Sequence, residues 1–336
     1  MTVTVLHQGL LTTIQDLGRY GAQKYGVIVS GAMDSYSLRI ANLLVGNEES
    51  EGALEVTLFG TSLQFENDQL IAITGGDLAA SLDGEKAPMW RPVLVRKGSI
   101  LTFKSGTKGA RAYIAFAGGI SIPQAMGSKS TYLRAGIGGF QGRALQKGDT
   151  FDCGEMNALG LSFFHQLKAR DEHFTWSVNY KPLLNLQQPQ TIRVLEGTEF
   201  NRFDEQSQQL LFTEPYTLTT QADRMGYRLE GTTQLTLIEE FELLSEGVTY
   251  GTIQVPSNGQ PIILMVDRQT TGGYPKIGQI ISADLPSMAQ LQPTATIQFQ
   301  KVSLEEAQTE FLKNEWLIED IKRGIQLKGQ RCLTKN

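Results

Sequence analysis

The sequence predicts a mainly β protein that forms barrels or sandwiches and carries a few short helices. Between residues 52 and 151, short apolar runs recur at near-regular spacing, separated by turns of Gly, Asp and Ser. This pattern is typical of all-β barrels and sandwiches. Asp83–Gly84 lies between two such runs, and this dipeptide favours a tight turn between antiparallel strands. Helical periodicity occurs in too few places for a doubly wound α/β sheet, in which helices alternate with strands.

The first elements along the chain are two strands followed by a helix. Residues 2–6 alternate polar and apolar side chains, and residues 9–14 form a second short strand pattern. Ser30 is placed to cap a helix whose apolar side chains recur at helical spacing. Gly46 is the expected end of this helix, because glycine adopts the left-handed conformation that commonly follows a last turn.

We expect two β subdomains. Residues 1–154 form the first, which is expected to be β-barrel-like. Residues 155–189 mix charges, glutamines and aromatics without a sustained period, so we interpret them as a linker. Residues 190–324 form the second subdomain with a terminal helix, and residues 325–336 are expected to be a frayed tail.

Two helices are expected in the C-terminal subdomain. Residues 198–211 can form a short helix with aromatic side chains on its inner face. Ser303 and Glu306 have the spacing of a capping box, and apolar residues follow at helical spacing until Gly324. The terminal helix is therefore expected to run from about Ser303 to Gly324.

Composition describes an ordinary globular protein. The chain has 336 residues, which is more than one ordinary core organises and suits two domains. Apolar residues make up 40% and charged residues 19%, and the formal net charge is −5. Basic residues are interleaved with acidic ones, so no block of charge indicates nucleic acid or an anionic membrane.

The cysteines and the hydropathy pattern favour a cytoplasmic protein. Cys153 and Cys332 are far apart and make no disulfide framework, which fits a reducing compartment. The first ten residues lack the charged and apolar regions of a signal peptide. No apolar run reaches the roughly 18 residues that a membrane span requires, so we expect no membrane association.

Several nucleotide and metal motifs are missing. Residues 136–142 are rich in glycine, but Gln141 stands where a dinucleotide fingerprint needs its third glycine. There is no phosphate-binding loop ending in Gly-Lys-Ser/Thr, so the chain is not expected to bind ATP alone by that device. The three histidines are not spaced as a zinc set, and no metal is expected. No Ala-Met-Lys-Met segment is present, so the chain itself is not expected to carry covalently attached biotin.

The candidate functional stretch runs from residue 253 to residue 284. Residues 262–266 form an unbroken apolar run that is short enough for a core strand. Asp267, Arg268 and Gln269 follow its end, and then come two threonines, two glycines and Tyr274. A connection between strands does not need an acid, a guanidinium, an amide, hydroxyls and a phenol in succession. We therefore expect the functional edge of the molecule here.

Motifs spread over nearly the whole chain follow the order of one known family. They are TIQDLGR at residues 13–19, SGAMD at 30–34, ANLLVGN at 41–47, Gly118–Gly119, Gly127–Ser128, Gly142–Arg143 with Gly148–Asp149, DRMGYRLEG at 223–231, and the stretch 254–274. The sequence resembles the KipA family, whose members are also called allophanate hydrolase subunit 2 or the C subunit of 5-oxoprolinase. That family is related to half of the carboxyltransferase domain of urea carboxylase.

The resemblance implies a fold, a reaction and partners. It implies cyclophilin-like β-barrel subdomains, which agrees with the β pattern. It implies a heteromeric complex with the KipI-like B subunit and the A subunit of 5-oxoprolinase, a bacterial enzyme that uses ATP to convert 5-oxo-L-proline to L-glutamate. The chain is then expected to be part of an ATP-dependent lactam hydrolase and to be inactive alone, with ATP bound by a partner or at the interface.

Opening a lactam sets requirements that the candidate stretch can meet. The nitrogen lone pair is delocalised into the carbonyl, and phosphorylating the carbonyl oxygen would make that oxygen a leaving group. Such chemistry needs cations and amides around a developing oxyanion and a group that transfers a proton. Asp267 and Tyr274 are the proton-transfer candidates, and Arg268 is the candidate clamp for a carboxylate or phosphate.

Further residues are candidates for substrate binding. In the same stretch they are Gln254, Gln269, Thr271, Gly272 and Gly273, and elsewhere they are Arg224 and, as an opposite wall, Asp16, Arg19, Ser30 and Asp34. Structural roles compete with this interpretation. Asp267 with Arg268 can be an ion pair that closes a barrel end, and Asp34 can serve only the first turn of a helix.

Two other functions stay open beside the 5-oxoprolinase hypothesis. One is a regulatory binding protein that sequesters the KipI-like partner, as the family name implies. The other is half of a biotin-dependent, urea-type carboxyltransferase whose biotin carrier is a separate chain. Sequestration would survive mutation of Asp267 and Arg268, whereas either enzymatic role would not.

Overall fold

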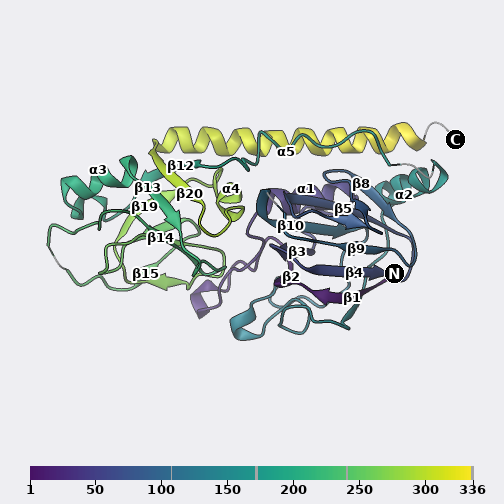
Figure 1. The fold of residues 1–336 in the computed structure, drawn as a ribbon, viewed down its shortest axis with the longest axis horizontal. Coiled ribbons are helices and arrows are strands. Elements are labelled where there is room, and N and C mark those ends of the chain that lie inside the picture. The colour runs from purple at the N-terminus through teal and green to yellow at the C-terminus, as the bar shows by residue number, and fades with distance from the viewer. Residues whose placement is uncertain (107, 171–172, 240, 334–336) are drawn as a thin grey trace. The chain divides into compact units, whose positions relative to one another are not determined.

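The computed structural model describes residues 1–106, 108–170, 173–239 and 241–333 (Figure 1). The chain divides into two compact units. Unit 1 comprises Met1–Arg19, Ser30–Leu184 and Glu315–Asn336, and unit 2 comprises Tyr20–Val29 and Asn185–Asn314. Strands dominate both units, which confirms the predicted mainly β class.

Unit 1 contains two antiparallel sheets. One has the strand order β11-β1-β4-β9-β6-β7, and the other has the order β2-β3-β10-β5-β8. The strands are β1 Thr2–Gln8, β2 Leu11–Gln15, β3 Ala53–Thr57, β4 Thr61–Phe65, β5 Gln69–Asp77, β6 Ser81–Leu82, β7 Glu85–Lys86, β8 Pro92–Val95, β9 Ile100–Thr102, β10 Lys108–Phe116 and β11 Thr150–Asp152.

The core of unit 1 is formed by side chains from both sheets. Val3 and Val5 of β1 alternate with more exposed neighbours, because successive strand side chains point to opposite faces. Ile71 and Ile73 of β5 join the same apolar cluster. The strand β5 is buried over almost its whole length, and the helix α1 (Ser35–Leu44) packs against β5 and β10. The five-stranded sheet is therefore covered by α1 as well as by the core.

The N-terminal helix begins later than its expected cap. Asp34, and not Ser30, is the N-cap of α1, and its carboxylate accepts a hydrogen bond from the Ser37 backbone N–H at 2.9 Å. Ser30 has φ 58°, in the left-handed region, and lies in the chain that leads to the helix. A carboxylate at this position satisfies an amide that lacks a helical partner, which explains why the helix starts at Ser35.

Unit 2 is built around a closed barrel. Its strand order is β12-β19-β16-β17-β14-β13-β20, and the parallel pair β12–β20 closes it. The barrel strands are β12 Gln190–Glu196, β13 Pro215–Leu218, β14 Gly226–Glu230, β16 Thr252–Gln254, β17 Ile262–Leu264, β19 Lys276–Ile280 and β20 Thr296–Lys301. A separate two-stranded ribbon consists of β15 (Glu246–Gly247) and β18 (Thr271–Gly272). The closed barrel confirms the predicted barrel architecture, and β17 is the core strand predicted ahead of the candidate stretch.

Helices in and after unit 2 differ from the prediction in extent. The single helix expected at 198–211 is two elements, a 3₁₀ turn at Phe200–Arg202 and α3 at Glu205–Thr213, where Asp204 caps α3. A short α4 spans Leu285–Ala289. The last helix, α5, spans Leu304–Leu333, so the expected end at Gly324 and the description of all helices as short are wrong.

Burial beyond Gly324 explains the length of α5. A glycine inside a helix costs only about 1 kcal/mol relative to alanine, so it does not by itself end one. Ile318 and Ile325 are 1% and 3% exposed, and they lie seven residues apart on one face of the helix. Their burial continues on both sides of the glycine and offsets that cost.

The segment that the sequence indicated as a linker, 155–189, contains the helix α2 (Ala158–Arg170). Phe163 and Leu167 of α2 are buried, and α2 contacts β8 and β5. By contact clustering, the chain up to Leu184 belongs to unit 1. Within the described residues, none of the helices combines the length and the apolar character that crossing a membrane requires.

Candidate functional site

Unit 2 contains a pocket of about 470 Å³ beside the barrel strands β14 and β17. This volume suits a small molecule. Its lining residues are Gln221, Asp223, Met225, Gly226, Arg228, Val248, Gln254, Ile262, Leu264, Arg268, Gln269, Thr271, Gly272, Gly273 and Tyr274. Seven candidates from the stretch 253–284 therefore meet in one pocket: Gln254, Arg268, Gln269, Thr271, Gly272, Gly273 and Tyr274.

The β15–β18 ribbon positions one wall of this pocket. Glu246 pairs with Gly272, and Gly247 pairs with Thr271. A Cβ atom on Gly272 would lie 2.6 Å from Nε2 of Gln254, so the absence of a side chain lets the ribbon approach that amide. Gln254 in turn donates a hydrogen bond from Nε2 to the Tyr274 backbone oxygen at 3.1 Å. The glycine and the amide together hold the backbone of the candidate stretch against the barrel.

Arg268 places a cationic group in the pocket. Its Nε donates to the Val248 backbone oxygen at 3.3 Å, and Nη1 donates to the Met265 backbone oxygen at 3.4 Å. Among the described residues, no carboxylate forms an ion pair with Arg268. Burial lowers the pKa of Arg268 below its usual range, while the phenol groups of Tyr20 and Tyr250 oppose that shift. A half-buried guanidinium that has backbone partners only can accept an anionic ligand without first losing a carboxylate.

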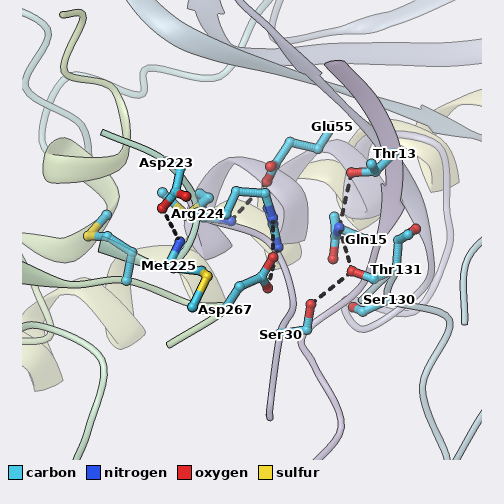
Figure 2. Close-up of polar contacts among 12 residues, drawn as sticks. Thr13, Gln15, Ser30, Glu55, Ser130, Thr131, Asp223, Arg224, Met225 and Asp267 are labelled. Atoms are coloured by element: carbon cyan, nitrogen blue, oxygen red, sulfur yellow. Dashed lines mark hydrogen bonds and ion pairs between the residues drawn. The ribbon is translucent and has the colours of Figure 1, made fainter. Parts of the chain in front are cut away.

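Asp267 pairs with Arg224 and not with its neighbour Arg268 (Figure 2). Arg224 donates from Nε to Oδ2 at 2.9 Å and from Nη2 to Oδ1 at 3.1 Å. The Asp267 backbone N–H also donates to the Arg224 backbone oxygen at 2.8 Å. Both side chains are buried, at 5% exposure for Arg224 and 6% for Asp267. The pair fastens the chain before β14 to the chain after β17, and neither residue lines the pocket.

A buried lysine supports the same ribbon, and sequence reasoning missed it. Lys276 is 8% exposed and forms ion pairs with Glu199, at 3.2 Å, and with Glu246 of β15. It opposes Gln254 in the pairing of β16 with β19. A lysine at the start of an apolar strand pattern was the available signal, because such a side chain needs an anionic partner when buried.

The unit 1 candidates lie in a different set of contacts. Asp16 is 6% exposed, and its carboxylate accepts hydrogen bonds from the Gly18 N–H at 2.8 Å, the Ser128 hydroxyl at 2.7 Å and the Lys129 N–H at 2.6 Å. The Ser130 hydroxyl is a further donor to the same carboxylate. Asp16 therefore joins the loop after β2 to the loop around residue 129, and its oxygens are occupied by that task.

Arg19, Ser30 and Gln15 converge on the backbone of the same loop. Arg19 is 1% exposed and donates from Nη2 to the Ser130 backbone oxygen. Ser30 donates from its hydroxyl to the Thr131 backbone oxygen at 3.0 Å, and Gln15 donates from Nε2 to the same oxygen at 3.3 Å (Figure 2). These contacts build a rigid polar cluster within unit 1.

Asp34 belongs to a buried chain of hydrogen bonds that the sequence did not indicate. Its backbone N–H donates to the Tyr113 hydroxyl at 2.8 Å, and that hydroxyl donates to Oε2 of Glu55 at 2.7 Å. The Met33 N–H donates to the same Glu55 oxygen at 2.9 Å. Burial first, and the carboxylate of Glu55 second, raise the pKa of Tyr113 well above its usual range. Glu55 lies between two buried apolar residues of β3, and a charged residue in such a run was the signal to follow.

The arrangement allows ligand binding by charge and amides. The unit 2 pocket offers a guanidinium, two glutamine amides, a threonine hydroxyl and the phenol of Tyr274, which is 52% exposed. Within the described residues, no group of three or more His, Cys, Asp or Glu side chains is arranged to hold a metal ion. Binding of an anion and its orientation by amides is the chemistry that these side chains support.

Comparison with known proteins identifies relatives over nearly the full length. Residues 25–301 match the carboxyltransferase domain family, subdomains A and B. The chain is 40% identical over 320 residues to the 5-oxoprolinase C subunit of Haemophilus influenzae, with coverage of 94% of this chain and 96% of the relative. It is 42% identical over 304 residues to the 5-oxoprolinase C subunit of Escherichia coli, with coverage of 90% and 92%.

A solved structure confirms the fold. The urea amidolyase of Kluyveromyces lactis superposes with a TM-score of 0.84 at 28% identity, over 95% of this chain and 20% of the longer protein. The chain thus spans about a fifth of the urea amidolyase but nearly all of the two 5-oxoprolinase proteins. Because sequence and fold agree over most of its length, this chain belongs to the carboxyltransferase domain family and, within it, resembles the C subunit of 5-oxoprolinase.

Proposed function

We propose that this chain is the C subunit of an ATP-dependent 5-oxoprolinase, which converts 5-oxo-L-proline to L-glutamate together with a KipI-like B subunit and an A subunit. The observation that carries the proposal is the identity of 40% and 42% to two proteins of that name over nearly the whole of both chains. A protein named as one lettered component of an enzyme implies the others, and the chain alone is expected to be inactive.

The unit 2 pocket supports this proposal by its chemistry. 5-Oxoproline is a small molecule with one carboxylate and one lactam amide, and a pocket of about 470 Å³ has room for it. Arg268 would bind the carboxylate through its planar fork. Gln254 and Gln269 would orient the lactam carbonyl and N–H, and Tyr274 is the group placed to exchange a proton with the ring.

Asp267 takes a positioning role in this proposal. Both of its oxygens accept hydrogen bonds from Arg224, so the pair holds the chain that carries Arg268 in place. ATP is assigned to a partner or to the interface with it, because the sequence has no phosphate-binding loop that opens a helix. This chain's part in the reaction is then to bind and orient the lactam.

The test is 5-oxoproline-dependent hydrolysis of ATP by the chain alone and mixed with its B-type and A-type partners. We expect activity only in the full mixture. Arg268→Gln should raise the KM for 5-oxoproline, whereas Arg202→Gln, a control on an exposed arginine outside the pocket, should leave it unchanged. Absence of activity from a mixture in which all three proteins form a complex would refute the proposal.

A urea-type carboxyltransferase role is the second candidate. The fold agreement with urea amidolyase, at a TM-score of 0.84, favours it. The chain would then act with a separate biotin carrier, because its sequence has no biotin-acceptor segment. Transfer of a carboxyl group from a carboxylated carrier to urea, with no response to 5-oxoproline, would decide in favour of this candidate.

A further inference from the structure

The unit 2 pocket continues into a second one along the same strands. The second pocket has a volume of about 390 Å³ and is lined by Thr219, Thr220, Gln221, Arg228, Leu229, Glu230, Asn258, Gln260, Pro261 and Ile262. Gln221, Arg228 and Ile262 line both pockets. Arg228 and Ile262 are paired in the register of β14 with β17. The two pockets are therefore neighbouring parts of one groove, and Arg228 lies where they meet.

Arg228 and Arg268 are both available to a ligand. Arg228 is exposed, and none of the described residues forms a hydrogen bond or an ion pair with its guanidinium. Arg268 has backbone oxygens as its partners and no carboxylate among the described residues. Elsewhere in unit 2, Arg193 is paired with Asp284 and Glu310, and Arg224 with Asp267. Two uncompensated guanidiniums in one groove thus stand apart from the structural arginines of this unit.

Acidic side chains in the groove do not cancel this charge. Asp223 lines the first pocket, but its Oδ1 accepts hydrogen bonds from the backbone N–H groups of Met225, at 2.7 Å, and Gly226, at 3.0 Å. Glu230 lies in the second pocket and is exposed to solvent. The pocket that contains both arginines is therefore a site of positive potential, and such a site concentrates anions.

We propose that this groove binds a small molecule with two anionic groups, one held by Arg268 and the other by Arg228. The amides of Gln221 and Gln254 and the hydroxyl of Thr271 lie along the lining and can bond the polar atoms between the two ends. Arginine suits both positions, because its planar fork bonds two oxygens of a carboxylate or phosphate at once.

Under the proposed function, which this step requires, the second anionic group appears during the reaction. The substrate 5-oxoproline carries one carboxylate. Hydrolysis of the lactam C–N bond adds water, which gives a second carboxylate and an ammonium group. Phosphorylation of the lactam oxygen by ATP would likewise place an anion at that end. Arg268 would bind the carboxylate that is present throughout, and Arg228 the group that gains charge.

A matched pair of probes tests the two-anion site on the full chain alone. Glutarate and its half-amide glutaramate have nearly the same shape, and they differ by one negative charge. Their dissociation constants are measured by NMR titration at low ionic strength, because salt screens the exposed Arg228. We expect glutarate to bind about tenfold more tightly than glutaramate, as one charged hydrogen-bonding group contributes that much or more.

Variants assign the two ends. Arg228→Gln should abolish the difference between the probes, whereas Arg268→Gln should weaken both by about tenfold or more. Arg202→Gln, outside the groove, should change neither. Equal binding of the two probes, no binding of either, or a difference that persists in Arg228→Gln would overturn the proposal.

These results are separable from those of the enzyme assay. If the complex hydrolyses ATP with 5-oxoproline but glutarate and glutaramate bind equally, the proposed function stands and the two-anion groove is refuted. If glutarate is preferred through Arg228 but the assembled complex has no 5-oxoprolinase activity, the groove stands and serves another dianion.

Discussion

The Arg224 guanidinium bonds both carboxylate oxygens of Asp267, at 2.9 and 3.1 Å, across 43 positions of sequence. Both side chains are buried, so water does not compete for these bonds. The backbone N–H of Asp267 donates to the backbone oxygen of Arg224 as well. This pair fixes the start of the segment that carries Arg268, Gln269 and Tyr274 into the pocket.

Removing one member of this pair should destabilise unit 2 strongly. Arg224→Met and Asp267→Asn should each lower the free energy of unfolding by about 3–5 kcal/mol, because each leaves the other group buried without its main counter-charge. The measurement is urea unfolding of both single variants and the double variant. Because the two residues act together, the double variant should lose less than the sum of the single losses. Strictly additive losses would show that the pair is not the source of the effect.

Tyr113 should make the protein sensitive to high pH. The Tyr113→Phe variant loses the hydroxyl that links the Asp34 N–H to Glu55, and this should cost about 1–3 kcal/mol at pH 7. Burial and Glu55 raise the pKa of Tyr113 in the folded state, so the unfolded chain releases this proton first. Its contribution to stability is therefore complete below about pH 10, the unfolded value, and is lost as the pH rises further.

The check is the slope of stability against pH between about 9 and 11, on either side of the unfolded value. Wild-type protein should lose stability faster than Tyr113→Phe over this interval, so the two curves converge. Parallel curves would mean that Tyr113 ionises equally in the folded and unfolded states. Tyr216, whose pKa burial also raises, is present in both proteins and cancels from the comparison.

Local patterns predicted much of the fold, because several elements depend on near neighbours in sequence. The capping box at the start of α5 is present: the Ser303 N–H donates to Glu306, and the Glu306 N–H donates to the Ser303 hydroxyl. The short apolar runs of residues 52–151 became strands of the two sheets in unit 1. The end of α5 could not be predicted this way, since the burial of Ile325 depends on tertiary packing.

The candidate site was predicted in part, and the error has a geometric cause. The segment from Arg268 to Tyr274 lines a pocket, as its density of polar side chains suggested. Adjacency of Asp267 and Arg268 suggested an ion pair, but side chains of neighbouring residues in extended chain point in opposite directions. Asp267 instead meets Arg224, and a pairing across 43 positions leaves no mark in one sequence. The Glu55–Tyr113 contact, 58 positions apart, was missed for the same reason.

The Arg143–Asp149 pair should contribute stability that acid removes. Arg143 donates to the Asp149 carboxylate from Nη1 at 2.6 Å and from Nη2 at 2.9 Å. Arg143 lowers the pKa of Asp149, and the Gln146 backbone N–H adds to this effect. A depressed folded pKa stabilises the protein above the unfolded value of about 4, and that stability is lost as the pH falls through the folded pKa.

Asp149→Asn should therefore cost about 1–2 kcal/mol at pH 7 and progressively less below about pH 4. Urea midpoints at pH 7 and pH 3 measure this. The Arg143→Gln variant supplies the matched control, because it should show the same narrowing of the difference from wild type. A cost that is the same at both pH values would mean that the charge of Asp149 is not responsible.

Two glycines of one loop allow a test of close packing against backbone strain. Gly136 and Gly138 have φ of 65° and 69°, so alanine is strained by a similar amount at either position. A Cβ on Gly138 would lie 2.2 Å from the Ser130 backbone oxygen, whereas none of the described atoms lies within 4 Å of a Cβ on Gly136. Gly136→Ala should cost about 1–2 kcal/mol from strain alone.

Gly138→Ala should cost roughly 1–3 kcal/mol more than Gly136→Ala, because a backbone oxygen cannot turn aside as a flexible side chain can. The displaced Ser130 oxygen is also the acceptor for Arg19. The shift should therefore extend to the Asp16 cluster, whose amide N–H groups at Gly18 and Lys129 would exchange faster with solvent. Urea unfolding measures the first effect, and hydrogen exchange measures the second. Equal costs for the two alanines would mean that the glycine-rich loop reflects backbone conformation alone, with no need for close approach to residue 130.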